Sequence, residues 1–204
     1  MLHKYLEIAS TPSVKAARAH YGSATQYARL DGSLDPAGPV ANAHLTDRES
    51  TFIADRDSFY IASVSETGWP YVQFRGGPPG FLRVLDEHTL GYAEFRGNRQ
   101  YITTGNMAGN NRVSLFLMDY ANRRRLKIFG RLAATDANDD PALAAKLAVA
   151  DYPARIERAV LIKVEAFDWN CPQHITRRFT EAEFAKAPAP VRQELASCGL
   201  RPSA

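Results

Sequence analysis

Cysteine is scarce in this chain, since Cys171 and Cys198 are the only two among 204 residues. Two thiols cannot build a disulfide framework, and they supply too few ligands for a structural zinc site. We therefore expect free thiols in a reducing compartment and no bound metal.

Long apolar runs are also missing. No window holds the roughly 18 apolar residues that a membrane-spanning helix needs. The N-terminal stretch MLHKYLEIASTPSVKAARAHYG lacks an apolar run followed by a small-residue cleavage site, the pattern of a secretory signal. The sequence therefore indicates a cytoplasmic protein with no membrane partner.

A strong excess of either charge is the third absence. Lys and Arg number 25 against 22 acidic residues, which gives a net charge of +3. That balance is too mild to indicate a nucleic-acid partner. The hydrophobic share of 45% is instead ordinary for a globular protein, and the length favours a single core with terminal extensions.

The two extensions have helical signals. A helix with its linker is predicted over residues 1–45, because Thr11-Pro12 is typical of the start of a helix that runs to about Arg29. A polar helical tail is predicted over residues 180–204. The core between them opens with Thr46-Asp47-Arg48-Glu49, a capping-box pattern that predicts a short helix.

Strand-like patterns dominate the core. Runs of β-branched and aromatic residues are separated by turns, and no βαβ rhythm with a glycine-rich first turn occurs. The stretch Gly76-Gly77-Pro78-Pro79-Gly80 indicates a bulge or corner of the kind that barrel closure requires. We predict a mainly antiparallel β fold with flanking helices, a barrel of six or seven strands. The predicted strands cover residues 59–64, 69–74, 81–85, 90–95, 112–119, 125–133 and 159–167.

The stretch FRGNRQYITTGN, residues 95–106, combines Gly97, a capping Asn98 and the arginines Arg96 and Arg99 at a predicted helix start. A helix N-terminus offers unpaired N–H groups and a positive dipole end, so this stretch can bind a phosphate dianion. Solvated arginines over an ordinary capped helix are the alternative.

A second basic run, Arg123-Arg124-Arg125 with Lys127, admits three interpretations. Strand alternation places Arg125 and Lys127 on one face and Leu126 and Ile128 on the other. A solvated strand end, an Arg125 that faces a ligand and a nucleic-acid patch all fit this pattern, although few aromatics are placed to stack bases.

The segment DWNCPQHI, residues 168–175, holds Cys171 three residues before His174. A cysteine nucleophile needs an adjacent base and an electropositive setting, and a metal site needs three or four ligands. Both of these roles stay open, together with a packed thiol that carries no chemistry.

The order of these stretches resembles one known family. RDSFYIASVSETGWPYVQFRGGPPGFLRVLD, GYAEFRGNRQYI, NNRVSLFLMDY, RRRLKIFGR and DWNCPQHI follow one another as in the pyridoxamine 5'-phosphate oxidase-like FMN-binding split barrels. The resemblance implies a six-stranded split β-barrel over residues 46–179. It also implies a homodimer with FMN at the subunit interface.

The resemblance further implies a flavin site. Gly97-Asn98-Arg99-Gln100 matches the family's Gly-Ser-Arg-Lys phosphate turn, with Asn for Ser and Gln for Lys. Arg75 and Arg83 fall at or near the family's other basic positions. Arg125 falls near a glutamine that contacts the flavin ring, and Trp169 near a tryptophan that closes the site from the partner subunit. The implied cofactor-binding residues are Arg75, Arg83, Asn98, Arg99, Gln100, Arg125, Trp169, Asn170 and Gln173.

Two departures from the family argue against a vitamin B6 phosphate as the substrate. True pyridoxamine phosphate oxidases carry Arg-x-His-Asp-Arg where this chain reads Ile175-Thr176-Arg177-Arg178-Phe179, and the acidic DANDDPALAAKLAVA replaces their substrate-phosphate helix. We expect an FMN-dependent oxidoreductase that transfers electrons or hydride between a nicotinamide-type donor and a small acceptor. The alternative is a non-catalytic binder of flavin, haem or deazaflavin that serves as a reservoir, sensor or electron-transfer partner, because a fold does not fix its cofactor.

Overall fold

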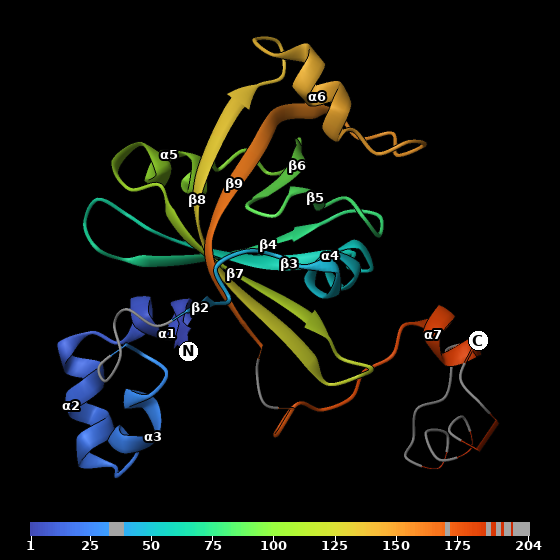
Figure 1. Ribbon diagram of the computed structural model, residues 1–204. Helices are drawn as coiled ribbons and strands as arrows, with labels where there is room; N and C mark the ends of the chain where they lie inside the picture. The colour runs from blue at the N-terminus through green and yellow to red at the C-terminus, as the bar shows by residue number, and fades with distance from the viewer. Residues whose placement is uncertain (33–38, 170–171, 187–188, 191–192, 194–196, 198–204) are drawn as a thin grey trace.

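One seven-stranded sheet organises the molecule (Figure 1). The computed structural model describes residues 1–32, 39–169, 172–186, 189–190, 193 and 197. Neighbouring strands are antiparallel throughout, in the order β4-β3-β7-β8-β9-β6-β5. The strands are β3 (Ser58–Val64), β4 (Pro70–Gly76), β5 (Arg83–Asp86), β6 (Thr89–Phe95), β7 (Arg112–Asp119), β8 (Arg124–Asp136) and β9 (Ile156–Trp169).

Short helices flank the sheet, and a two-stranded parallel ladder near the N-terminus joins β1 (Leu2–His3) to β2 (Val40–Ala41). The helices are α1 (Lys4–Ala9), α2 (Pro12–His20), α3 (Ala24–Ala28), α4 (Asp47–Ala54), α5 (Ile102–Gly109), α6 (Pro141–Leu147) and α7 (Glu181–Lys186). Across the described residues, no helix is long and apolar enough to cross a membrane.

The core lies on one face of the sheet because the strands alternate in polarity. In β7 the side chains of Leu115 and Leu117 are fully buried, and in β8 those of Leu126 and Ile128 are. The predicted division of β8 into an apolar and a basic face is therefore confirmed. Inward-facing side chains from β3, β6, β7, β8 and β9 meet in one continuous core cluster.

The two edges of the sheet are drawn toward each other. β4 and β5 stand at opposite ends of the strand order, yet only residues 77–82 connect them. Six residues span at most about 20 Å even when fully extended. At the corner a Cβ on Gly77 would lie 2.7 Å from the Phe81 ring, so this position requires glycine. The corner predicted from the Gly-Pro stretch is therefore confirmed.

The sheet has seven strands, which agrees with the seven ranges predicted from the sequence pattern and exceeds by one the six that the family resemblance implies. In the described part of the chain, no ladder joins β4 to β5, so closure of the barrel stays a prediction. The single helix predicted up to Arg29 is wrong. It breaks into α2 and α3 because Gly22 adopts a left-handed conformation, with φ of 79°, between them.

The N-terminal arm, residues 1–32, is attached to the sheet through α1, which packs against β9 (blue in Figure 1). The Tyr5 ring stacks on Phe129 with centroids 4.2 Å apart. His3 Nε2 lies 3.4 Å from Asp168 Oδ1, and Lys127 Nζ lies 2.6 Å from Asp168 Oδ2. An apolar stack and a small ion network thus attach the arm to the domain.

Candidate functional site

A cavity of about 250 Å³ lies in the gap between the two drawn-together sides of the sheet. Strands β4 and β6 form its facing walls, and Phe81 from the connecting corner contributes to it. The remaining wall comes from the loop before α5, the first turn of α5 and the start of β9. The lining residues are Gln73, Phe74, Arg75, Gly76, Phe81, Tyr92, Ala93, Glu94, Phe95, Gly97, Asn98, Arg99, Tyr101, Thr103, Thr104, Glu157 and Arg158.

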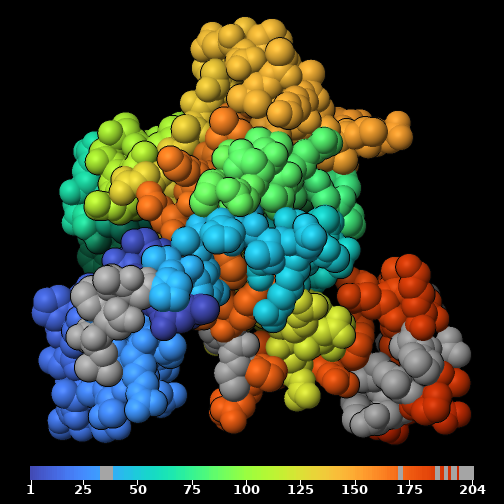
Figure 2. All heavy atoms as spheres, in the orientation of Figure 1, coloured from blue at the N-terminus to red at the C-terminus, as the bar shows by residue number. Residues whose placement is uncertain are grey.

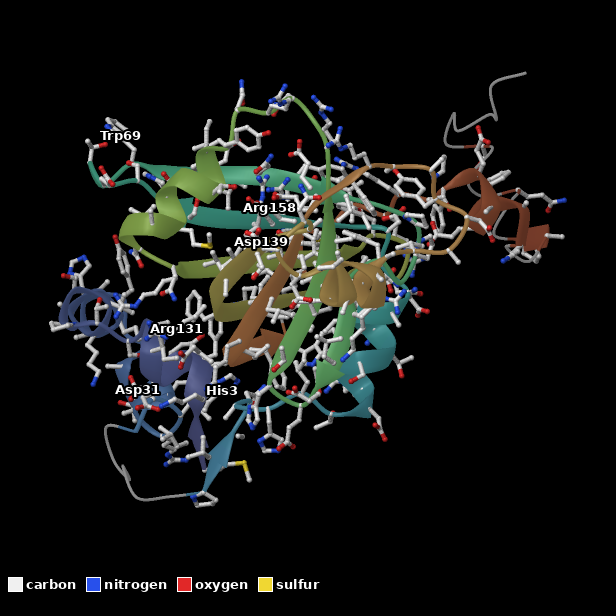
Figure 3. All side chains as sticks on the ribbon, turned by 90° about the horizontal axis from the view of Figure 1, so that it is seen from above. His3, Asp31, Trp69, Arg131, Asp139 and Arg158 are labelled. Atoms are coloured by element: carbon white, nitrogen blue, oxygen red, sulfur yellow. The ribbon has the colours of Figure 1, made fainter. Side chains whose placement is uncertain are left out.

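A buried carboxylate joins the two walls. Glu94 in β6 is only 6% exposed, and its Oε1 pairs with the Arg75 guanidinium of β4. Its Oε2 accepts a hydrogen bond of 2.5 Å from Arg158 Nε of β9. Burial disfavours the charged form of Arg158, but the hydrogen bond and the charge of Glu94 outweigh it and raise the pKa of Arg158. Figure 3 shows Arg158 in the middle of the molecule, far from Trp69 at the tip of the β3–β4 hairpin.

The loop before α5 is held by local hydrogen bonds and two left-handed residues. Arg99 and Tyr101 have φ of 61° and 54°. Arg99 Nε donates to Tyr101 Oη at 3.2 Å, and Tyr101 Oη donates to the Glu157 carboxylate at 3.3 Å. The Tyr101 ring also lies 4.9 Å from the Arg158 guanidinium. The loop is therefore connected to the charged cluster on the cavity floor.

The expectation that Asn98 caps the following helix is wrong. Helix α5 begins at Ile102, with Tyr101 at the N-cap position. The Asn98 side chain instead accepts a hydrogen bond from the Gln100 backbone N–H at 3.2 Å, which closes a local turn. The arginine-bearing residues thus lie in a turn ahead of the helix.

The donors that this turn offers remain available for a ligand. Arg99 is exposed, and its only hydrogen bond within the described residues goes to Tyr101. Arg96 lies 3.7 Å from Glu157 and is not among the lining residues. On the cavity floor the Nε atom of Arg75 is buried and has no partner in the described structure. An acceptor-rich ligand would satisfy both Arg99 and Arg75.

Comparison with known proteins gives the family. The family model of pyridoxamine 5'-phosphate oxidase matches residues 45–171. The chain belongs to the pyridoxamine 5'-phosphate oxidase family. No curated protein matched the sequence.

Several solved structures are similar to this chain at low sequence identity. HupZ of Group A Streptococcus is 16% identical, over 66% of this chain and 100% of that chain, with a TM-score of 0.50. An FMN-binding protein from Syntrophomonas wolfei is 12% identical, over 61% of this chain and 88% of that chain, with a TM-score of 0.47. A protein of Clostridium acetobutylicum related to general stress protein 26 is 15% identical, over 67% and 94%, with a TM-score of 0.44.

Three of the residues predicted from the family resemblance meet at the cavity of this family member. Arg75, Asn98 and Arg99 all line it. Gln100 lies in the same turn but is not a lining residue. Arg83 lies elsewhere, where its Nη2 donates to the Ala148 carbonyl at 2.6 Å.

The remaining predicted cofactor-binding residues do not line this cavity. Arg125 stands over the Phe116 ring at 5.4 Å, on the outer face of the sheet. The Trp169 indole donates to Glu49 Oε1 at 2.6 Å. Gln173 is exposed in a turn, and Asn170 lies outside the described residues, as does Cys171. Their contacts with a flavin stay predictions.

Sequence reasoning missed Glu94, Arg158 and Gln73. Gln73 accepts a hydrogen bond of 2.9 Å from the Thr103 hydroxyl and thereby ties α5 to β4. A signal for Glu94 was present, because a glutamate inside the apolar run TLGYAEF must find a cation if it is buried. Its arginine partners could not be chosen from the sequence, since they come from β4 and β9.

Proposed function

We propose that this protein binds FMN, with the cofactor phosphate held at the turn of Asn98 and Arg99. The observation that carries the proposal is the pair of arginines at the cavity, the exposed Arg99 at its rim and Arg75 on its floor, whose buried Nε has no partner in the described structure. Phosphate and sugar hydroxyl oxygens are acceptors of the kind that these groups need. Membership of the family supports the same cofactor.

A homodimer completes the proposed site. The cavity of about 250 Å³ is smaller than the roughly 300 Å³ at which ligand pockets usually begin, so a whole dinucleotide-sized or flavin-sized ligand needs a further wall. The outer face of β3 and β4 offers one contact surface, the apolar strip formed by Tyr60, Val64, Val72 and Phe74. Val72 and Phe74 are 61% and 57% exposed. Burying them against a second copy would remove that apolar surface from water.

The proposed activity is that of an FMN-dependent oxidoreductase. When bound, FMN would supply the redox chemistry, the transfer of hydride or electrons between a nicotinamide-type donor and a small acceptor. In this proposal the residues of the chain bind the cofactor and orient the reactants. Glu94 and Glu157 are held in ion pairs, and burial raises the pKa of Tyr92 above its ordinary range. The Tyr92 phenol therefore keeps its proton near neutral pH.

The ion pairs that engage the cavity carboxylates Glu94 and Glu157 favour a second candidate, a non-catalytic cofactor binder that acts as a reservoir, sensor or electron-transfer partner. Flavin, deazaflavin and haem are all compatible with the family fold. The two candidates make different predictions for reduction by nicotinamide donors.

Titration of the purified protein with FMN, followed by flavin fluorescence, tests the proposal. Arg99→Gln should weaken binding by about tenfold or more, because a charge-assisted hydrogen bond contributes about 1.5–3 kcal/mol. Arg96→Gln is the matched control, since it removes the same charge three residues away and outside the lining. No binding to the wild type, or equal losses in both variants, contradicts the FMN site.

Anaerobic mixing of the FMN-loaded protein with NADH or NADPH separates the two candidates. Bleaching of the flavin absorbance supports the oxidoreductase. Stable oxidised flavin with both donors supports the non-catalytic binder. A Soret band after addition of haemin, without FMN binding, assigns the cavity to haem instead.

A further inference from the structure

Tyr101 stands between the turn of Asn98 and Arg99 and the charged floor of the cavity. Its hydroxyl oxygen accepts a hydrogen bond of 3.2 Å from Arg99 Nε and donates to the Glu157 carboxylate, both of whose oxygens lie at 3.3 Å. Its ring lies 4.9 Å from the Arg158 guanidinium. One side chain therefore contacts groups from the loop before α5 and from β9. In Figure 2 the yellow-green α5 lies at the surface of the molecule.

The backbone at Tyr101 has a conformation that aromatic residues rarely adopt. Its φ of 54° lies in the left-handed region, where a Cβ crowds the following carbonyl oxygen. The residue also occupies the N-cap position of α5, yet its side chain makes no capping hydrogen bond. The hydroxyl instead reaches Glu157, 56 positions further along the chain. The side chain of Tyr101 is therefore held by the cavity wall and not by the helix that follows it.

Glu157 fixes the direction in which the Tyr101 hydroxyl donates. Two guanidinium groups balance the charge of this carboxylate, since Arg96 Nε lies 3.7 Å from its Oε1 and Arg158 Nη2 lies 3.6 Å from its Oε2. An ionised carboxylate only accepts hydrogen bonds, so the hydroxyl proton points to Glu157. The lone pairs of the hydroxyl oxygen are then left for Arg99 Nε, which can only donate.

The hydrogen bond to Tyr101 engages one corner of the Arg99 guanidinium and leaves the opposite edge for a ligand. Arg99 lines the cavity, and within the residues that the structure describes neither of its Nη groups has a partner. The two Nη groups of an arginine form a fork that matches two oxygens of a phosphate. A long exposed side chain loses rotamer freedom when it binds, but here part of that freedom is already lost before the ligand arrives.

From these contacts we infer that Tyr101 is a positioning residue, which holds the Arg99 fork for a phosphate and so makes the cavity prefer FMN to riboflavin. Riboflavin has the same ring and ribityl chain but lacks the phosphate, so it gains nothing from a fixed Arg99. The inference rests on the proposed FMN site and names the side chain that sets its selectivity for the phosphorylated ligand.

Titrations of the full chain with FMN and with riboflavin, followed by flavin fluorescence, test this inference. Tyr101→Phe keeps the ring beside Arg158 and removes only the hydroxyl. The variant should bind FMN about fivefold more weakly than the wild type does, the effect of about one hydrogen bond, and its affinity for riboflavin should not change. Equal losses for the two flavins, or an unchanged preference for FMN, would overturn the inference.

A double-mutant cycle separates positioning from direct contact. Because Tyr101 acts through Arg99, adding Tyr101→Phe to Arg99→Gln should change the affinity for FMN by less than about twofold. Additive losses would show that the hydroxyl meets the ligand independently of Arg99, and they would contradict the positioning role.

Tyr152→Phe is the matched control, because it removes the hydroxyl of another exposed tyrosine that does not line the cavity. It should leave both affinities unchanged. A wild type that binds no FMN contradicts the proposed function and this inference with it. A wild type that binds FMN, together with a Tyr101→Phe variant that keeps the full preference, contradicts this inference alone. Unchanged melting temperatures establish that the variants are folded.

Discussion

Glu94 is the residue on which the cavity depends most. Its carboxylate stands between Arg75 and Arg158, and it therefore connects two strands, β4 and β6, that no described ladder joins. Taken alone, a buried acid in a proposed anion site is unfavourable. Here it neutralises two arginines that would otherwise repel each other in a medium of low dielectric constant.

Glu94→Gln should lower the free energy of unfolding by about 3 kcal/mol, because it leaves two partly buried arginines without their carboxylate. Urea unfolding measures this loss. Inorganic phosphate should restore more stability to the variant than to the wild type, since it replaces the missing negative charge. The exposed Glu66→Gln controls for the substitution itself, and an equal phosphate effect in all three proteins would contradict the role given to Glu94.

Asp168 makes stability depend on pH. Burial alone would raise its pKa, but hydrogen bonds from His3 and Lys127 and the charge of Lys127 lower the pKa of Asp168 below its ordinary value. A depressed folded pKa gives stability that is present above the unfolded value of about 3.9 and is lost as pH falls through the folded value. Asp168→Asn should therefore be less stable than the wild type at neutral pH, and the difference should vanish in acid. Urea unfolding across this pH range measures it, with exposed Asp139→Asn as the control.

For single residues, the sequence predicted which side chains belong to the site better than it predicted which groups they contact. Arg75, Asn98 and Arg99 were predicted together because the phosphate turn is a local pattern, and they do meet. The sequence could not show that Arg83 lies outside the cavity, because its hydrogen bond to the Ala148 carbonyl joins segments 65 residues apart. The role of Asn98 was wrong because its side chain satisfies the nearest free N–H, that of Gln100, before any helix begins.

Among the elements, β8 shows how backbone proximity restricts sequence. The pairing of β8 with β9 shifts register between Phe129 and Gly130. A Cβ on Gly130 would lie 2.6 Å from Ile162 Cγ2 and 2.8 Å from the Lys163 carbonyl oxygen. The backbone of β9 cannot move aside without breaking its ladders, so only glycine fits there.

Gly130→Ala should destabilise the protein by about 1–3 kcal/mol, the usual cost of overpacking a core. Gly105→Ala in α5 should have the opposite sign, a gain of up to about 1 kcal/mol, because a Cβ there meets nothing within 4 Å and alanine favours helix. Thermal or urea unfolding of the two variants measures both signs. Loss of stability in Gly105→Ala would show that α5 is not the regular helix described.

Elements with strong local signals were predictable. The strands around Phe59, Leu115 and Ile162 follow β-branched alternation, and the capping box at Thr46 and Glu49 forms with hydrogen bonds of 2.5 and 3.1 Å to the glutamate. Strand β1 was not predictable, because its two residues pair with β2 across nearly 40 positions of sequence. This pairing forms only when the N-terminal arm is packed against the sheet.

At the scale of the whole molecule, the apolar strip on β3 and β4 bears on assembly. The proposed dimer should have twice the 22.6 kDa mass of the chain by light scattering. Val72→Glu/Phe74→Glu should yield a monomer, because two charges in the buried centre of an interface would be unpaired. Tyr21→Glu, in an exposed residue beside α2, is the control. A monomeric wild type, or a double variant that stays dimeric, would contradict this use of the strip.

The fold class followed from the number and alternation of strands, but the number of subunits did not follow from any local pattern. Val72 and Phe74 alternate with polar residues as edge-strand residues do, and their exposure is visible only once β3 and β4 are paired. In sequence, an apolar strand face that a second chain would cover has the same alternating pattern as a strand face that packs on the protein's own core.

The short corner at residues 77–82 has a consequence for how the cavity assembles. Arg75 and Glu94 are 19 positions apart in the chain (94 minus 75), so the loop that must close before they meet is small. The entropy cost of closing a loop rises with the logarithm of its length. The short connection through residues 77–82 therefore brings β4 and β6 together at a lower entropy cost than a longer connection would. Cutting the chain within the corner would leave every ladder intact while removing that connection. The site should then lose its ligand at denaturant concentrations that the sheet itself withstands.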